Sequence, residues 1–235
     1  MQNEFKFLIG NDWRESKNVL EVRNPYNNDI IGITYLAVED DVNDAIQKAV
    51  FAFKETRKLP AYKRAETLCN IKKGILERKE DFARTITLEA GKPIADSRLE
   101  VERAICTFQI TMEEAKRISG EYISLDISER SKNRNAIHKR FPIGPILGIT
   151  PFNFPLNLVV HKIAPAIASG NTIIIKPASK TPLTALLLGK VISESGLPNG
   201  AFSVFPCLPG LAEQIISDDR IKMLTFTGSA EIGWR

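Results

Sequence analysis

Apolar side chains recur along this chain in two patterns, short runs of strand length and longer stretches at helical spacing. The segment from Gly144 to Ser179 combines both patterns. Apolar runs over 145–150 and 172–175 predict two strands, and helical spacing over 156–167 predicts a helix between them. A rigid, non-helical corner, Pro151-Phe152-Asn153-Phe154-Pro155, separates the first strand from this helix. Together these elements predict a βαβ unit, in which ligands bind where strand carboxyl ends meet the following turns.

The first 120 residues predict short strands followed by four helices. The predicted strands cover 5–9, 19–23 and 30–36, with a polar turn, Gly10-Asn11-Asp12, after the first of them, and the predicted helices cover 40–53, 61–78, 80–90 and 94–119. Asp40 and Asp41 are expected to cap the first helix, Gly91 to stop the third, and Gly120 to terminate the fourth. The predicted buried stripe of the second helix contains Ala65, Leu68, Ile71, Ile75 and Leu76. In the fourth helix, heptad-like spacing persists for only about two heptads, which favours a packed surface helix over a coiled coil.

The remaining segments complete an alternating pattern of strands and helices. A polar stretch over 128–135 lies between strand-like runs over 122–127 and 136–141 and predicts a projecting hairpin. After the βαβ unit, helices are predicted over 182–195 and 209–217, strands over 201–205 and 223–226, and a final helix after Ser229. The pattern predicts an α/β fold with a doubly wound parallel sheet. We divide the chain into residues 1–120, a hairpin at 121–142 and a doubly wound core at 143–235.

Composition excludes several classes of protein. With 235 residues and 43% hydrophobic content, the chain can bury a sizeable core. The net charge of +4 arises from 32 basic and 28 acidic residues that are interspersed, which argues against a nucleic-acid surface. No apolar run approaches the roughly 20 residues that span a membrane. The first residues lack the features of a signal peptide, so we expect a cytoplasmic protein.

The cysteines and histidines suggest no metal site and no disulfide. Cys69, Cys106 and Cys207 are widely spaced and odd in number, and His138 and His161 lie apart in the sequence. Cys69 and Cys106 fall on apolar faces of predicted helices, and we expect both to be core thiols.

Three polar positions in the core at 143–235 could carry chemistry, and each also has a simpler interpretation. The Asn153 carboxamide could donate to a developing oxyanion, or could satisfy the backbone of its own turn. Lys176, at a strand end, could bind ribose hydroxyls or be a solvated charge. The turn Thr227-Gly228-Ser229 could hold a diphosphate at a helix start, or could only cap that helix. The usual dinucleotide fingerprint G-x-G-x-x-G is absent.

Several motifs in order resemble the aldehyde dehydrogenase superfamily. They are the corner at 151–155, Lys176-Pro177-Ala178, Gly196-Leu197-Pro198-Asn199-Gly200 and the stretch from Phe226 to Gly233. The resemblance runs from Asn24 to Gly233. It implies a variant Rossmann fold, NADP or NAD as the cofactor and a small aldehyde as the substrate. It also implies a homodimer or homotetramer, because the matching hairpin of the family crosses to a neighbouring subunit.

The resemblance also assigns roles to particular residues. It implies that Asn153 holds the oxyanion and that Lys176 binds ribose. The cofactor-binding residues that it implies are Ile149, Thr150, Pro151, Phe152, Asn153, Lys176, Ala178, Ser179, Lys180, Gly210, Phe226, Thr227, Gly228, Ser229 and Ile232. NAD-preferring relatives often carry glutamate where this chain has Ser179, followed here by Lys180, which favours use of NADP. Arg103 could pair with an anionic substrate group, or could be a solvated helix arginine.

The family's catalytic cysteine and glutamate are not found in this sequence. Cys207 lies too early to be that nucleophile. The chain therefore resembles the N-terminal half of a longer enzyme, closest in character to NADP-dependent lactaldehyde, glyceraldehyde-3-phosphate or semialdehyde dehydrogenases, and is expected to be inactive alone. The alternatives are an inactive or split nucleotide-binding module, an acyl-CoA or acyl-phosphate reductase of the same superfamily, and a non-enzymatic scaffold.

Overall fold

A mixed six-stranded sheet forms the centre of the computed structural model, which describes residues 4–234. Its strands are β1 (Phe7–Ile9), β2 (Asp12–Arg14), β7 (Ile146–Ile149), β8 (Ile173–Lys176), β9 (Phe202–Val204) and β10 (Met223–Phe226). They lie in the order β10-β7-β8-β9-β1-β2. The first four in this order are parallel, whereas β1 is antiparallel to both β9 and β2. The predicted α/β fold is therefore confirmed; the sheet is parallel as predicted over four strands, and β1 and β2 add an antiparallel edge.

Helices cover both faces of this sheet. The helices are α1 (Glu39–Thr56), α2 (Ala61–Glu77), α3 (Lys79–Ala90), α4 (Ile94–Ala115), α5 (Asn157–Ala168), α6 (Leu183–Ser193), α7 (Pro209–Ile216) and α8 (Ala230–Gly233). The connections β7-α5-β8 and β8-α6-β9 each lead to the neighbouring strand in one direction along the sheet. The connection β9-α7-β10 runs in the opposite direction, from β9 back past β8 and β7 to β10 at the edge. Right-handed crossovers therefore place α5 and α6 on one face and α7 on the other, beside α1. The helices α2, α3 and α4 pack on the outer side of α5 and α6.

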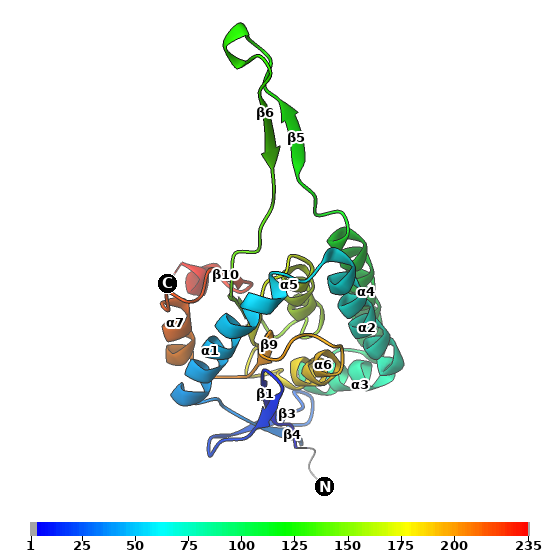
Figure 1. The fold of residues 1–235 in the computed structure, drawn as a ribbon. Helices are drawn as coiled ribbons and strands as arrows, with labels where there is room; N and C mark the ends of the chain where they lie inside the picture. The colour runs from blue at the N-terminus through cyan, green and yellow to red at the C-terminus, as the bar shows by residue number, and fades with distance from the viewer. Residues whose placement is uncertain (1–3, 235) are drawn as a thin grey trace.

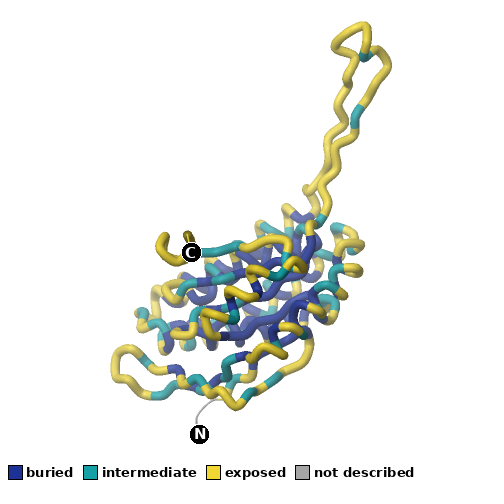
Figure 2. Tube along the Cα trace, turned by 90° about the vertical axis from the view of Figure 1, so that its left-hand side faces the viewer, coloured by how far each residue is buried: buried dark blue, intermediate teal, exposed yellow. Residues whose placement is uncertain are grey.

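Two smaller two-stranded sheets lie outside this core. One pairs β3 (Val19–Arg23) with β4 (Ile30–Tyr35). The other pairs β5 (Glu121–Ser124) with β6 (Asn135–His138), and a short 3-10 turn (Glu129–Ser131) follows β5 before the chain returns. This second pair is the predicted hairpin, which projects far from the core and is exposed almost throughout (Figures 1 and 2). Hereafter we call residues 121–138 the arm.

Three predicted boundaries were wrong. The helix α4 ends at Ala115 rather than next to Gly120. Gly120 instead lies at the base of the arm, where a Cβ atom would overlap the carbonyl oxygen of His138. The helix α1 begins at Glu39, before both predicted cap residues, but Asp41 at its third position still caps it, because its carboxylate accepts the Val38 backbone N–H at 3.1 Å. Asp12, predicted to lie in a turn, begins strand β2.

Two predictions of buried side chains were also wrong. Leu76 is 56% exposed, because the stripe formed by Leu68, Ile71 and Ile75 leaves the residue after Ile75 turned away from the core. Cys106 is exposed for the same reason, since Ala104 and Phe108 form the buried side of that turn of α4. Cys69 is half-buried.

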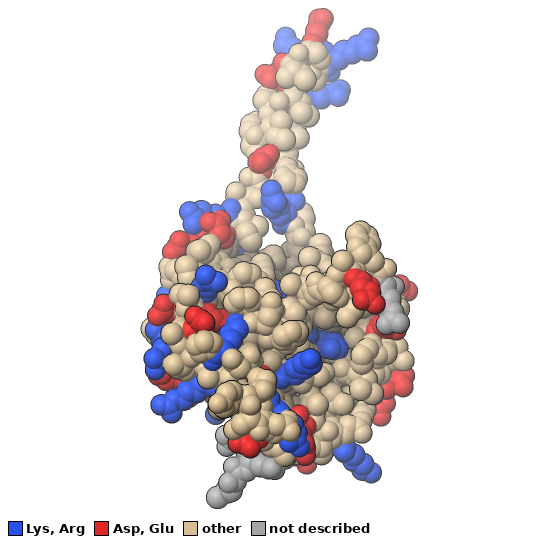
Figure 3. Space-filling model, turned by 180° about the vertical axis from the view of Figure 1, so that it is seen from behind, with Lys and Arg blue, Asp and Glu red and all other residues tan. Residues whose placement is uncertain are grey.

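Surface and interior features limit what the rest of the molecule can bind. Basic and acidic side chains are interspersed over the face shown in Figure 3, and charges also gather at the tip of the arm.

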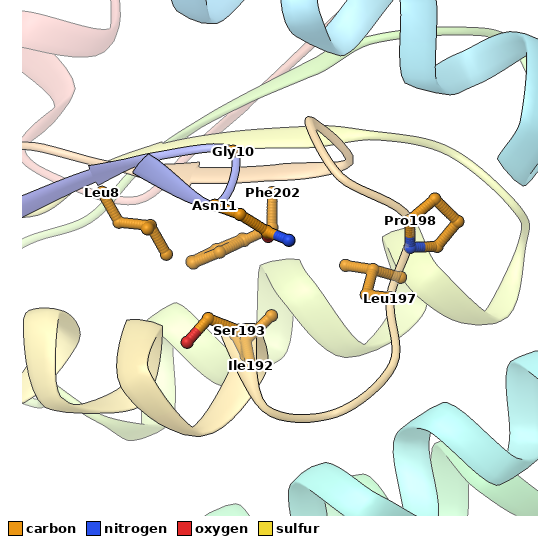
Figure 4. Close-up of a pocket in the computed structure, with 8 residues that line it drawn as sticks. All are labelled: Leu8, Gly10, Asn11, Ile192, Ser193, Leu197, Pro198 and Phe202. Atoms are coloured by element: carbon orange, nitrogen blue, oxygen red, sulfur yellow. The ribbon is translucent and has the colours of Figure 1, made fainter. Parts of the chain in front are cut away.

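A small cavity of about 10 Å³ between the β1–β2 turn and the end of α6 is lined by Leu8, Ile192 and Phe202 (Figure 4). That volume accommodates about one water molecule, so the cavity is no ligand site. Within residues 4–234, no helix combines the length and apolar character that crossing a membrane requires.

Candidate functional site

The carboxyl ends of three adjacent strands bring the predicted site residues together. Ile149, at the end of β7, pairs with Lys176 of β8 on one side and with Phe226 of β10 on the other. Backbone hydrogen bonds continue one residue further, from Thr150 N to Lys176 O at 3.2 Å and from Thr227 N to Ile149 O at 3.1 Å. The turns after these three strands therefore leave the same edge of the sheet side by side. They contain the corner at 151–155, residues 177–181 and the turn at 227–229.

The corner after β7 presents its central residue to solvent. Phe152, Asn153 and Phe154 are exposed, whereas Pro155 and Leu156 are buried where α5 starts. This arrangement follows from the sequence, because the two prolines keep the corner out of the helix and the apolar residues after it anchor the chain in the core. Asn153 thus lies at the tip of the corner with its carboxamide accessible to a ligand.

A buried carboxylate on α4 holds the base of this corner. Glu100 is 2% exposed, and its Oε1 accepts the backbone N–H groups of Leu156 at 2.9 Å and Asn157 at 3.1 Å. Its Oε2 accepts from Lys92 Nζ at 2.6 Å. The same ammonium lies 3.7 Å from the ring centroid of Phe154, a close cation–π contact. Neither Glu100 nor Lys92 was among the site residues predicted from the sequence.

The turn after β8 contacts the other side of the corner. Lys176 and Ala178 are half-buried, whereas Ser179 and Lys180 are exposed. Thr181 Oγ1 donates to the carbonyl oxygen of Phe152 at 3.3 Å. Lys180 Nζ lies 5.4 Å from the centroid of the Phe152 ring. The two aromatic residues that flank Asn153 therefore each contact a lysine, from different parts of the chain.

A second buried carboxylate caps α6, the helix that follows this turn. The two oxygens of Glu89 accept the backbone N–H groups of Leu183 at 2.8 Å and Thr184 at 3.0 Å. Complete burial raises the pKa of Glu89 to about 7, although the hydrogen bonds from α6 act in the opposite direction. Glu89 and Glu100 thus play the same structural role at the starts of two neighbouring helices.

The turn after β10 combines small residues with an aromatic ring. The ring of Phe226 packs so closely over Gly228 that a Cβ atom there would overlap it. Residues 226–230 together with Gly233 and Trp234 line an open hollow of about 370 Å³. Gly228 and Ser229 are exposed at this hollow, so their backbone groups are accessible to a ligand.

A buried lysine lies beneath this turn. Lys162 of α5 is 5% exposed and donates to Thr227 Oγ1 at 2.8 Å and Thr225 Oγ1 at 3.3 Å. Burial lowers the pKa of its ammonium group. Lys162 was not among the site residues predicted from the sequence either.

Other residues singled out in the sequence lie further from these three turns. Gly210 is in the first turn of α7, which follows β9, and Ile232 is exposed on α8. Arg103 is exposed on α4, one helical turn beyond Glu100. Cys207 is buried, and burial raises the pKa of its thiol to about 11, so it is protonated at neutral pH. Within residues 4–234, no three side chains of histidine, cysteine, aspartate or glutamate cluster as metal ligands would.

The helical spacing of buried positions could have indicated Glu89 and Glu100, the two buried carboxylates that were not predicted. Glu89 continues the stripe of Phe82 and Ile86, and Glu100 lies between Ser97 and Ala104 on the buried side of α4. An acidic residue on an apolar stripe requires a polar partner in the core. Its partner could not be read from the sequence, because both carboxylates bind backbone groups of helices more than 50 residues away.

Comparisons with known proteins agree with this arrangement of motifs. A family model described as the aldehyde dehydrogenase family matches residues 13–235. The chain is 39% identical to a 3-sulfolactaldehyde dehydrogenase of Priestia aryabhattai, over 98% of this chain and 48% of that protein.

Two solved structures resemble the chain over nearly its whole length. Aldehyde dehydrogenase 21 from Physcomitrella patens, in complex with the reaction product succinate, is 44% identical with a TM-score of 0.96, covering 100% of this chain and 49% of that one. An NADP-dependent glyceraldehyde-3-phosphate dehydrogenase from Bacillus halodurans, complexed with NADP, is 30% identical with a TM-score of 0.95, covering 99% and 50%. The chain therefore spans about half the length of these relatives.

Proposed function

This chain belongs to the aldehyde dehydrogenase family, and we propose that it carries the cofactor site and the oxyanion amide of an NADP- or NAD-dependent oxidation of an aldehyde to a carboxylic acid. The observation that carries the proposal is the pairing of Ile149 with both Lys176 and Phe226. This pairing brings the Asn153 corner, a strand-end lysine and a glycine-containing turn to one edge of the sheet. An amide donor thereby lies beside groups that suit a ribose and a diphosphate.

The residues at this edge fit a nicotinamide dinucleotide. Lys176 offers an ammonium group to ribose hydroxyls, and Ser179 follows at an exposed position in the same turn. The turn at 227–229 offers backbone N–H groups and the Ser229 hydroxyl beside an open hollow of about 370 Å³. A side chain at Gly228 would meet the Phe226 ring, so the backbone stays accessible there only because the residue is glycine.

Within the proposed reaction, Asn153 stabilises the negative charge that develops on the aldehyde oxygen. Its exposed carboxamide donates an N–H group to that oxygen, and such donors act most strongly when the surrounding structure fixes them beforehand. A nicotinamide cofactor held at this edge would supply the hydride acceptor for the oxidation. The cysteine nucleophile and the glutamate base of the family have no counterpart at the described edge, and we propose that this chain alone turns over no aldehyde.

We further propose that the site favours NADP over NAD. Ser179 places no carboxylate where a 2′-phosphate would bind, and Lys180 adds a cation at the next position. The ring of Phe152 holds the Lys180 ammonium at 5.4 Å, within reach of the same turn. The relative from Bacillus halodurans, which is complexed with NADP, supports this choice.

The proposed substrate is a short aldehyde that carries a second, anionic group. The three relatives named above are a sulfolactaldehyde dehydrogenase, an enzyme complexed with succinate, and a glyceraldehyde-3-phosphate dehydrogenase. Sulfonate, carboxylate and phosphate share a negative charge, which a guanidinium group binds well. Arg103 is exposed one turn beyond Glu100, on the part of α4 that contacts the start of α5. We assign the anion to Arg103.

The arm supports the proposal of a homodimer or homotetramer. Its strands expose Tyr122, Ile123 and Ile137 far from the core, and exposed apolar residues on an unpaired two-stranded sheet favour burial against another chain.

Calorimetric titration with NADP and with NAD tests the proposal. We expect both nucleotides to bind, NADP more tightly, and a Lys176→Met variant to lose affinity for both. A split module that binds the cofactor without turnover would give the same binding curves. An acyl-CoA or acyl-phosphate reductase would be indicated if added coenzyme A or acyl phosphate, rather than an aldehyde, changed the affinity for the reduced nucleotide. Failure of both nucleotides to bind the folded chain would contradict the proposed cofactor site.

A further inference from the structure

The corner that presents Asn153 is fixed through its neighbours rather than by packing of the corner itself. Phe152, Asn153 and Phe154 are exposed, so the core does not hold their side chains. Thr181 binds the Phe152 carbonyl on one side. On the other side, Lys92 contacts the Phe154 ring, and Glu100 binds both Lys92 and the start of α5.

We propose that Glu100 is a positioning residue for Asn153, acting through Lys92 and Phe154. Its Oε1 caps the first backbone groups after the corner, which sets where the corner ends. Its Oε2 holds the Lys92 ammonium 2.6 Å away, and that ammonium in turn lies 3.7 Å from the ring centroid of the residue next to Asn153. One buried carboxylate therefore fixes both the backbone after the corner and an aromatic side chain within it.

The charge of Glu100 is needed for this arrangement. A buried carboxylate and its ammonium partner compensate each other, and removing the charge leaves Lys92 without its counter-ion. Lys92 is mostly buried, with 19% of its side chain exposed, and would then turn toward water and leave the Phe154 ring. The corner would keep its prolines but lose the contact that limits the motion of residues 152–154.

The substitution Glu100→Gln separates these two roles. A glutamine Oε1 can still accept the N–H groups of Leu156 and Asn157, so the cap of α5 is retained. Its Nε2 donates rather than accepts, so the bond from Lys92 is lost. Glu89→Gln is the control for loss of a buried carboxylate at a helix start. Each oxygen of Glu89 accepts one backbone N–H of α6, so this change removes one cap bond there but leaves the Glu100–Lys92–Phe154 contacts in place.

The test is the backbone ¹⁵N order parameter of residues 152–154, measured by NMR relaxation on this chain. We expect about 0.85 at Asn153 and Phe154 in the unaltered chain and in Glu89→Gln, and a fall below about 0.6 in Glu100→Gln. Unchanged order in Glu100→Gln, or equal loosening in both variants, would overturn the proposal.

A second variant keeps the test decisive if Glu100→Gln fails to fold. Phe154 is 37% exposed, so Phe154→Leu removes the ring that Lys92 contacts with little loss of core packing. We expect the order parameter of Asn153 to fall in this variant as well, and unchanged order there would contradict the role of Lys92 and Phe154. The inference rests on the proposed oxyanion role of Asn153. Its measurement needs neither cofactor nor substrate, so a failed nucleotide titration and a failed positioning test are separate outcomes.

Discussion

The ammonium group of Lys162 donates a hydrogen bond to Thr227 Oγ1 at 2.8 Å, linking the middle of α5 to the first residue of the turn after β10. Lys162 is almost fully buried, and within residues 4–234 its contacts at this end are two threonine hydroxyls rather than a carboxylate. The turn that we assign to the diphosphate therefore rests on a buried cation.

This pair leads to a prediction about stability at alkaline pH. Burial lowers the pKa of Lys162, so the unfolded chain binds this proton more tightly than the folded chain does. The contribution of Lys162 to the free energy of unfolding should therefore rise as the pH increases from the pKa of Lys162 in the folded chain toward 10.5, the ordinary pKa of a lysine. Urea unfolding at pH 7, 8, 9 and 10 should show the unaltered chain gaining stability relative to Lys162→Met. Lys190→Met, an exposed change on α6, should leave the gain from Lys162 in place, and a flat difference for Lys162→Met would contradict the prediction.

Glu89 should make the chain more stable at acidic than at neutral pH. Its pKa is about 7 in the folded chain and 4.5 when unperturbed, so the folded chain holds the proton more tightly. This contribution is fully present below pH 4.5 and is lost as the pH rises through 7, and a shift of this size corresponds to at most roughly 3 kcal/mol. Urea unfolding between pH 4.5 and 8 should show this loss, and Glu89→Gln should abolish it. Glu77→Gln, an exposed change on α2, should retain it, and an unaltered pH dependence in Glu89→Gln would refute the assignment.

The substitution Ser179→Glu should reverse the preference between the two nucleotides. A carboxylate at this exposed position would repel a 2′-phosphate and accept a hydrogen bond from a ribose 2′-hydroxyl. We expect the ratio of the two dissociation constants to move toward NAD by about tenfold, equivalent to about 1.4 kcal/mol. Calorimetric titration of both nucleotides measures this ratio. Ser119→Glu adds the same charge on the loop after α4 and should leave the ratio unchanged.

The substitution Gly120→Ala should weaken assembly without unfolding the core. An added Cβ atom would overlap the carbonyl oxygen of His138, so the base of the arm would have to open. We expect the fraction of dimer or tetramer at micromolar concentration to fall several-fold, as measured by sedimentation velocity. Gly210→Ala meets no atom within 4 Å and serves as the control. An assembly that is equally stable in both variants would mean that the arm does not carry the interface.

Local sequence patterns determined a large part of this fold. The βαβ unit was predicted almost to the residue, because β7, α5 and β8 are buried and so consist of nearly uninterrupted apolar residues. The arm was predicted from a change in composition, since an exposed hairpin needs no partner elsewhere in the chain to be recognised. The family was identified from motifs that occur in order, and the comparisons confirm it.

The tertiary structure alone decided which distant groups meet at the site. The sequence placed Asn153, Lys176 and Thr227 at strand ends, but only the order of the strands made Ile149 the common neighbour of Lys176 and Phe226. Glu89, Glu100 and Lys162 lie at helical positions that otherwise carry buried residues, so periodicity predicts their burial but not the groups that they bind. Their roles depend on hydrogen bonds to helices and turns more than 50 residues away, and such pairings arise from packing in three dimensions rather than from local spacing.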